Sequence, residues 1–307
     1  MIFEKRQNKR MYESDVEEKT SPIAKVKNWV NKKLKQSENT IPLVRLDGVI
    51  SPENKPNRLN IASVAPLLKK AFKMKKAPAV AIIVNSPGGY PVQSRLISKM
   101  IRDLADEHEK KVLVFIEDVA ASGGYFIAVA GDEIFADPSS IVGSIGVISA
   151  SFGFEDAIAK LGIKRRVHTA GRNKSMLDPF VAEKKADVDR LKTFQLDIHQ
   201  VFIDHVKSRR ADKFNGTDDE LFTGEWWTGV RALDLGLIDE LGDLHSVLKD
   251  RFGKDVKLKK IEGKKPFFSV PNLGSLSKIT ANINSESIAS EALSAIEERS
   301  LWSRFGL

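Results

Sequence analysis

Two short, nearly uninterrupted apolar runs limit most strongly what this chain can fold into. They are AVAIIV at residues 79–84 and VLVFIE at residues 112–117, and strands this apolar have to be covered on both faces. An amphipathic helix pattern at residues 91–111 lies between them, and another at 61–74 precedes them. Strands that alternate with helices predict an α/β fold, with a mostly parallel sheet and helices on its faces.

Weaker patterns predict the remaining elements on either side of this core. Alternating or continuous apolar residues predict further strands at residues 41–50, 133–138, 145–149 and 165–170. Helical spacing predicts a short helix of small residues at 122–130 and other helices at 155–162 and 181–210. Residues 226–239 resemble a helix that ends at a glycine and is followed by a short strand.

The 307 residues divide into three regions by composition. Residues 1–40 are a basic, polar N-terminal extension, and residues 41–262 carry the α/β pattern. Residues 263–307 contain a stretch rich in Pro, Gly and Ser, which predicts a linker, and then a tail helix. We expect this tail helix to dock on the protein or to contact another subunit.

The N-terminal extension contains a basic amphipathic helix pattern at residues 22–36. Its apolar residues recur at helical spacing, and its lysines are interrupted by no acidic residue. Such a helix packs on its own domain or on a neighbouring subunit, or it lies on an anionic membrane surface. We favour packing, because the apolar positions are few (Ile23, Val26, Val30 and Leu34).

Composition excludes several classes of protein. The absence of cysteine rules out disulfides, thiolate metal sites and a cysteine nucleophile. The net charge is +8, but no stacking aromatic residues or reader motif accompany it, so we expect no nucleic-acid binding. No apolar run reaches the length of about 18 residues that a membrane-spanning helix needs, and the N-terminus lacks the apolar core of a secretory signal.

Two glycine motifs follow the two buried strands. NSPGG, Asn85 to Gly89, comes directly after residues 79–84, and its glycines leave backbone amides uncovered by any Cβ atom. Uncovered amides at the carboxyl end of a parallel strand can hold an oxyanion, although a plain turn is the simpler interpretation. In the second motif, DVAASGGYFIA, Ser122 lies where a strand turns into a helix. That position suits an exposed nucleophile, but an ordinary helix N-cap is far commoner.

A serine nucleophile needs a base, and the residues alone leave two candidates. His168 lies on the predicted strand 165–170, and Lys174 lies in AGRNKSMLDPF. A lysine acts as a base only where burial lowers its pKa enough to make it neutral. A solvated loop lysine is the simpler interpretation of Lys174 from sequence.

Five motifs, in order and spacing, resemble the SppA/SohB signal peptide peptidases. They are NSPGG, AASGGYFIA, PSSIVGSIGVI, AGRNKSMLDPF and LFTGEWWTGVRALDLGLIDELG, and the resemblance spans about residues 41–262. It implies a ClpP/crotonase-like fold in which residues 41–262 form a peptidase catalytic domain. It also implies a Ser–Lys dyad that hydrolyses peptide bonds without a metal or other cofactor.

The resemblance assigns a role to each matching residue. Ser122 would be the nucleophile and Lys174 the general base, while the amides of Gly89 and Gly123 would form the oxyanion hole. Ser144, in GSIGV, would orient the lysine. The motifs occur once, which implies that one subunit supplies both members of the dyad, and the family implies a homo-oligomer. The predicted strand edge at 145–149 would bind an extended peptide by strand addition.

The expected substrates are signal peptides or other membrane-derived or unfolded peptides. Members of this family commonly carry an N-terminal transmembrane anchor, which this sequence lacks. We therefore expect a cytoplasmic protein, with the helix at 22–36 as a peripheral contact at the inner membrane. Two alternatives stay open: a crotonase-type acyl-CoA enzyme that does not need Lys174, and a catalytically silent membrane-associated scaffold.

Overall fold

A computed structural model describes residues 39–55, 57–263, 296 and 298–307 of the chain. The basic helix predicted at residues 22–36 and most of the predicted linker lie outside the described residues. Residues 298–303, within the predicted tail helix, are helical. Near the end of this tail, the ring of Phe305 meets that of Trp226 edge to face, with 6.0 Å between ring centroids.

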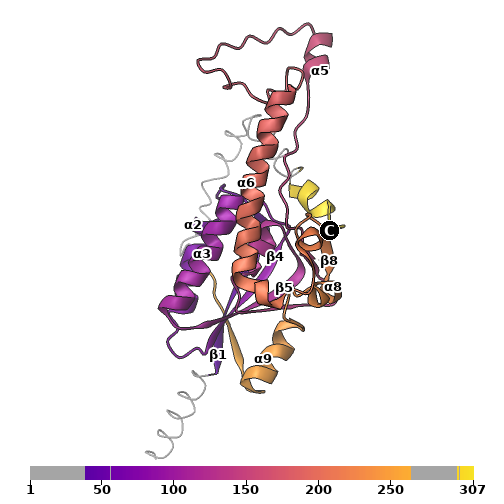
Figure 1. The fold of residues 1–307 in the computed structure, drawn as a ribbon. Coiled ribbons are helices and arrows are strands. Elements are labelled where there is room, and N and C mark those ends of the chain that lie inside the picture. Colours follow the sequence, from indigo (N-terminus) through magenta and orange to yellow (C-terminus); the bar gives the residue numbers. More distant parts are fainter. Residues whose placement is uncertain (1–38, 56, 264–295, 297) are drawn as a thin grey trace, which may run out of the picture.

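The centre of the fold is a parallel sheet (Figure 1). Each strand along its main path runs parallel to its neighbours. The order across the sheet is β10 (Lys257–Lys260), β1 (Thr40–Asp47), β4 (Ala79–Ser86), β5 (Lys111–Ala121), β6 (Glu133–Ala136) and β9 (Glu240–Leu241).

Shorter strands extend the sheet where the main strands end. β7 (Ile141–Gly143) pairs in parallel with the last residues of β5 and antiparallel with β8 (Trp226–Thr228). A separate parallel pair joins β2 (Val49–Ile50) to β3 (Arg58–Leu59). These short strands surround the carboxyl ends of β4 and β5, where ligands bind in parallel sheets.

The side chains of the central strands alternate between two apolar layers. On one face, Val80, Ile82 and Val84 join a large core with α2 (Ile61–Phe72), α3 (Pro91–Glu107), α4 (Gly123–Ala128) and α6 (Lys185–Arg210). On the other face, Ala81 and Ile83 pack towards α9 (Leu244–Phe252). Both faces are covered, which explains the continuous apolar runs and confirms the predicted α/β class with a mostly parallel sheet.

A long segment projects from the body of the molecule, and we call residues 148–201 the arm. It contains α5 (Glu155–Lys160) and the first part of α6, and none of its residues is buried. Figure 1 shows it rising from the end of the body opposite α9. Many of its large apolar side chains are exposed: Ile148, Phe152, Phe154, Leu161, Ile163, Val167, Met176, Val181, Phe194, Leu196 and Val201.

Several sequence predictions are wrong in this region. Residues 145–149 and 165–170 form no strand; the strand that was expected at 145–149 lies earlier, as β7. Residues 226–239 begin with a strand, β8, before the helix α8 (Gly229–Asp234). Residues 165–170 lie on the exposed arm, where no strand of the described chain pairs with them. The remaining described elements are a 3₁₀ turn (Ala211–Lys213) and α7 (Asp218–Leu221).

Candidate active site

Ser122 lies at the turn between β5 and α4. Its backbone has φ 51° and ψ −122°, a conformation that is strained for any residue with a side chain. Its amide donates a hydrogen bond to the Gly143 carbonyl of β7 at 2.8 Å, and its carbonyl accepts one from Phe126 in α4. A sharp, strained turn from strand to helix is the geometry that exposes the nucleophilic serine in α/β-hydrolases.

The two glycine motifs lie directly against one another. A Cβ atom on Gly88 would come within 2.8 Å of the Ser122 Cβ and 2.9 Å of the Gly123 amide nitrogen. A Cβ atom on Gly123 would lie 3.3 Å from the Gly89 amide nitrogen. Only glycines allow this approach, so the structure brings Ser122, Gly89 and Gly123 together as the sequence predicted.

The amides of Gly89 and Gly123 remain available to a ligand. Ile50 forms a bridge with the NSPGG segment, in which its amide donates to the Gly88 carbonyl and its carbonyl accepts from the Tyr90 amide. Gly89 itself takes no part in these bonds, because alternate amides of an extended chain point to opposite sides. Among the described residues, neither the Gly89 nor the Gly123 amide has an acceptor. Paired free amides beside a strained serine have the composition of an oxyanion hole.

Ser144 lies at the same edge of the sheet. Ala121 pairs with Gly143 in parallel, so the next residues, Ser122 and Ser144, follow neighbouring strands. Ser144 also has a positive φ, 53°, and its amide donates to the Glu225 carbonyl at 2.6 Å. The position is compatible with the predicted orienting role, which stays a prediction.

The structure does not bring Lys174 to Ser122 within one chain. Lys174 is exposed on the arm, in a turn closed by a 3.2 Å hydrogen bond from its amide to the Gly171 carbonyl. His168, the other candidate base, is also exposed on the arm and lies on no strand. The expectation that one subunit supplies both members of the dyad therefore does not match this arrangement. Within the described chain, Ser122 and the Gly89 and Gly123 amides therefore lie apart from both candidate bases.

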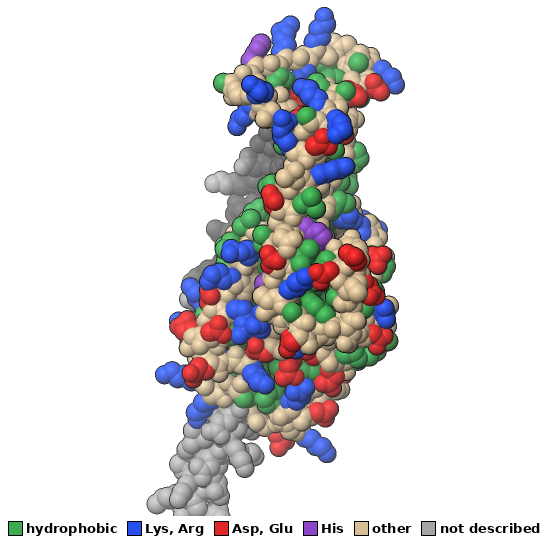
Figure 2. Space-filling model, viewed as in Figure 1, with side chains coloured by type: hydrophobic (Ala, Val, Ile, Leu, Met, Phe, Trp, Pro, Cys, Tyr) green, Lys and Arg blue, Asp and Glu red, His purple; other side chains and the backbone are tan. Residues whose placement is uncertain are grey.

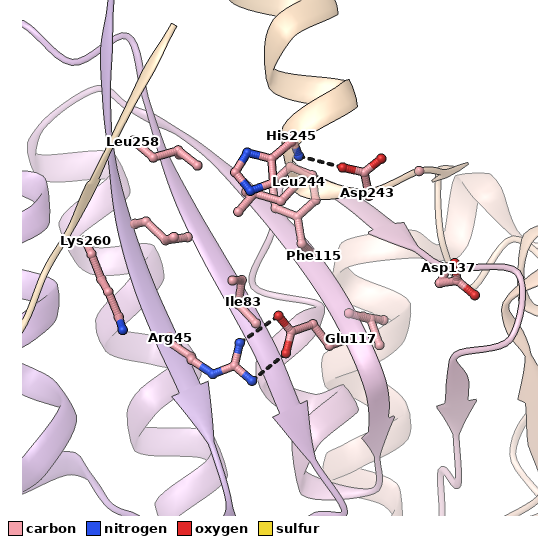
Figure 3. Close-up of a pocket in the computed structure, with 13 residues that line it drawn as sticks. Arg45, Ile83, Phe115, Glu117, Asp137, Asp243, Leu244, His245, Leu258 and Lys260 are labelled. Atoms are coloured by element: carbon pink, nitrogen blue, oxygen red, sulfur yellow. Dashed lines mark hydrogen bonds and ion pairs between the residues drawn. The ribbon is translucent and has the colours of Figure 1, made fainter.

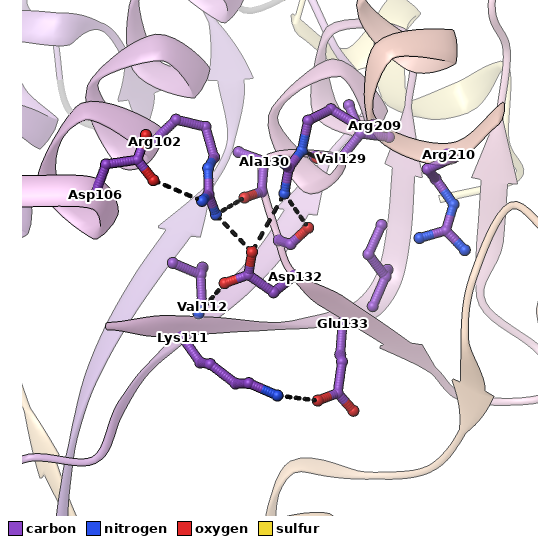
Figure 4. A network of polar contacts seen from close by, with 12 residues as sticks. Arg102, Asp106, Lys111, Val112, Val129, Ala130, Asp132, Glu133, Arg209 and Arg210 are labelled. Atoms are coloured by element: carbon purple, nitrogen blue, oxygen red, sulfur yellow. Dashed lines mark hydrogen bonds and ion pairs between the residues drawn. The ribbon is translucent and has the colours of Figure 1, made fainter. Parts of the chain in front are cut away.

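The far end of α4 is fixed by a polar network (Figure 4). Arg209 donates to the Val129 carbonyl at 3.2 Å, and Arg102 donates to the Ala130 carbonyl at 3.2 Å. Both guanidinium groups also contact Asp132, at 3.3 and 2.8 Å. Cations at the carboxyl end of a helix satisfy its last carbonyls, so the helix that begins after Ser122 is fixed at its other end.

Sequence reasoning missed the side chains that support this site. A Cβ atom on Gly123 would lie 2.4 Å from Ser94 Oγ of α3, so this fully buried serine lies directly behind Gly123. Ser94 gives no sequence signal, because a serine inside an amphipathic helix pattern resembles a surface residue. Asn85 was identified only as part of a glycine turn, although its side chain bonds the neighbouring strand.

A cavity lies on the face of the sheet that α9 covers (Figure 3). It has a volume of about 590 Å³, with an apolar floor formed by side chains of the layer beneath α9. Across it Arg45 meets Glu117, with 2.6 Å between Nη1 and Oε1, and the hydrogen bond to that carboxylate raises the pKa of Arg45. Neither Ser122 nor the two glycine amides line this cavity, so it is separate from the candidate site.

Comparisons with known proteins agree with the site. The family model described as Peptidase family S49 matches residues 105–259, about half of the chain. Protease 4 of Haemophilus influenzae is 33% identical over 68% of this chain and 34% of its own length. A protein of Enterococcus faecium described as a putative signal peptide peptidase SppA is 28% identical over 72% of this chain and 65% of its own length.

A more similar relative has a different kind of name. A Brucella abortus protein named Na(+)/H(+) antiporter NhaA is 52% identical over 92% of this chain. The chain spans only 39% of that protein, so the name describes a polypeptide with much more chain than is matched. Within the residues described here, no helix has the length and apolar character needed to cross a bilayer.

The α/β architecture found here agrees with the ClpP/crotonase-like fold implied by the motifs. The matched family is one of serine-type hydrolases, and the matched range contains positions 122 and 174. The chain belongs to peptidase family S49, the SppA and protease IV group of serine peptidases.

Proposed function

We propose that this protein is a serine endopeptidase in which Ser122 attacks the carbonyl carbon of a peptide bond. The observation that carries the proposal is the strained Ser122 turn beside the free amides of Gly89 and Gly123. The amides would stabilise the negative charge that develops on the carbonyl oxygen during attack. Each such donor is worth about 10²–10³ in rate where it has been removed from other hydrolases.

The proposed reaction uses one proton carrier. Neutral Lys174 removes the Ser122 hydroxyl proton as the Oγ–C bond forms, and returns it to the leaving amine as the C–N bond breaks. This leaves an ester between Ser122 and the acyl half of the peptide. A water molecule, deprotonated by Lys174, then attacks the ester and releases the acid and the free serine.

Lys174 would reach Ser122 from a neighbouring copy of the chain. The support is the arm, which carries Lys174 away from its own Ser122 and exposes many apolar side chains. Exposed apolar patches of this extent mark surfaces that contact another protein. Packing the arm on a second copy would bury these side chains together with Lys174, and burial is what makes a lysine neutral.

The proposed substrates are extended peptides released from membranes or from unfolded proteins, signal peptides included. The name of the Enterococcus relative supports this class. Such a peptide would lie along residues 145–149, which follow β7 and form no strand of their own in the single chain. Contact with an anionic membrane surface through residues 22–36 remains part of this proposal, and those residues lie outside the described ones.

Covalent labelling tests the proposed nucleophile. A fluorophosphonate probe should label the protein at Ser122, and Ser122→Ala should abolish both the labelling and the cleavage of a fluorogenic peptide. Ser139→Ala, at an exposed serine near the same edge, is the control and should retain both. Cleavage that survives in Ser122→Ala would contradict the proposal. Hydrolysis of acyl-CoA without peptide cleavage would instead support the crotonase-type alternative.

A further inference from the structure

Strand β5 contains an irregularity just before the nucleophile. Along β4, Val84 pairs with Ile116, and two residues later Ser86 pairs with Ala120, which is four residues after Ile116. Strand β5 therefore has two extra residues (4 − 2), which form a bulge at 117–118. A bulge leaves local backbone groups without ladder partners and re-aims the residues that follow it.

The same bulge is where β5 changes its neighbour on the other side. Up to Ile116 the strand pairs with β6, and from Val119 it pairs with β7. Ser122 and its bond to Gly143 depend on this change, because β7 holds the last residues before the turn. The geometry of the bulge thus determines the position of Ser122.

Three side chains form hydrogen bonds at the bulge, and we call them the bulge clamp: Asn85, Asp118 and Ser140. The Val119 amide donates to Asn85 Oδ1 at 3.2 Å, and Asn85 Nδ2 donates to Asp118 Oδ2 at 3.2 Å. On the opposite side, Ser140 Oγ donates to the Glu117 carbonyl at 2.5 Å. Asn85 and Ser140 are 8% and 2% exposed, and the bond from the Val119 amide to Asn85 is buried. Asp118 is exposed, and its bond to Asn85 is partly buried.

Asn85 links the two halves of the candidate site. The chain continues from Asn85 through Ser86 and Pro87 to Gly88 and Gly89, and the Gly89 amide is one of the two proposed oxyanion donors. The group it bonds, the Val119 amide, lies three residues before Ser122 on the neighbouring strand. A side chain that ties these two points together fixes the separation between the nucleophile and the oxyanion hole.

We propose that Asn85 is a positioning residue for the reaction: through Val119 and Asp118 it holds the β5 bulge that sets Ser122 beside the Gly89 and Gly123 amides. The inference rests on the proposed function, since it takes Ser122 as the nucleophile. Asn85 touches no reacting atom in this role. Loss of the Asn85 side chain should let the bulge relax and shift Ser122 relative to the two amides. A shift of about 1 Å in a reacting group can lower a rate about 100-fold.

Rates of fluorophosphonate labelling test this role. In Asn85→Ala the second-order rate constant for labelling Ser122 should fall about 10- to 100-fold, and kcat for a peptide should fall in parallel while KM changes less than about threefold. Asp243→Ala is the matched structural control, because it removes a carboxylate that accepts the His245 and Ser246 amides at the start of α9. It should lower the thermal midpoint yet label at the parent rate.

An exchanged pair separates positioning from simple loss of stability. Asn85→Asp alone sets two carboxylates against each other and should label as slowly as Asn85→Ala. Combining it with Asp118→Asn restores an acceptor for Val119 and a donor–acceptor pair across the bulge, and should bring the labelling rate back to within about threefold of the parent. If Asn85→Ala does not fold, the exchanged pair still tests the proposal.

The outcomes distinguish this inference from the proposed function. A parent protein that the probe does not label would overturn the proposed function, and this inference with it. A labelled parent together with a folded Asn85→Ala variant that reacts at the parent rate would overturn this inference alone. So would an exchanged pair that reacts no faster than Asn85→Asp.

Discussion

At the scale of single residues, the site depends on positions where the surroundings are so close that only glycine fits. Gly123 has Ser94 Oγ, Ile50 Cδ1 and the Gly89 amide nitrogen within 2.4, 3.1 and 3.3 Å of where a Cβ atom would lie. The last of these distances means that a methyl group would occupy space between the two proposed oxyanion donors. The sequence could predict this much, because paired glycines after adjacent buried strands meet at one sheet edge.

Replacing Gly123 by alanine should therefore lower the reactivity of Ser122 more than it lowers the thermal stability of the protein. We expect the rate of Ser122 labelling in Gly123→Ala to fall about 100-fold, as for the loss of one oxyanion donor. Gly263→Ala is the control, since a Cβ atom there meets nothing within 4 Å. Labelling kinetics and thermal unfolding measured on the same samples check the prediction, and a Gly123→Ala variant that reacts like the parent would refute the proposed role of this amide.

At the scale of elements, the continuous apolar runs were interpreted correctly and the weak pattern at 165–170 was not. Residues 79–84 and 112–117 are buried on both faces, which leaves a strand inside a sheet as the simplest structure. Residues 165–170 contain only two apolar side chains, Val167 and Ala170, which are too few to require a strand. Strand β10 escaped prediction because Lys257, Lys259 and Lys260 make an exposed sheet edge resemble a loop.

The junction of α3, α4 and α6 contains a half-buried histidine, His205. His205 Nε2 lies 3.1 Å from both Ser98 Oγ and the Phe126 carbonyl, and its ring stacks on Phe126 at 4.0 Å. Burial is the main cause that lowers the pKa of His205 from 6.5 to about 4, and Arg209 and Arg95 lower it further. The neutral form is thus the one that the folded state favours.

Acid should therefore weaken this junction. Above pH 6.5 the histidine is neutral in both states and contributes no pH dependence. Between pH 6.5 and about 4 the unfolded chain binds a proton that the folded chain does not, so the free energy of unfolding should fall by roughly 3 kcal/mol. Urea unfolding across this range should show the slope, and His205→Gln should flatten it, whereas His245→Gln, at an exposed histidine, should leave it unchanged.

At the scale of the whole molecule, the arm is the feature that one chain does not explain. Figure 2 shows Lys and Arg side chains gathered at its outer end and apolar side chains along its length. In an isolated chain these apolar groups would remain in water, which is unfavourable by about 25 cal/mol per Å² of apolar surface. Local sequence patterns cannot say which copy of Ser122 the proposed base Lys174 would serve, because that depends on packing between chains.

Mixed assemblies can decide whether the dyad is shared between copies. Ser122→Ala and Lys174→Ala should each be inactive alone, since each lacks one member of every site. When the two variants are co-expressed with different tags and purified through both, about a quarter of the sites should combine an intact serine with a neighbour's intact lysine. Peptide cleavage should then recover to about a quarter of the parent rate, and Ser122→Ala combined with Lys174→Ala in one chain should recover nothing with either variant. If each variant assembles to the parent size and the mixed assemblies stay inactive, Lys174 does not complete the site of another copy, and the arm would have to fold back on its own body to bring it there.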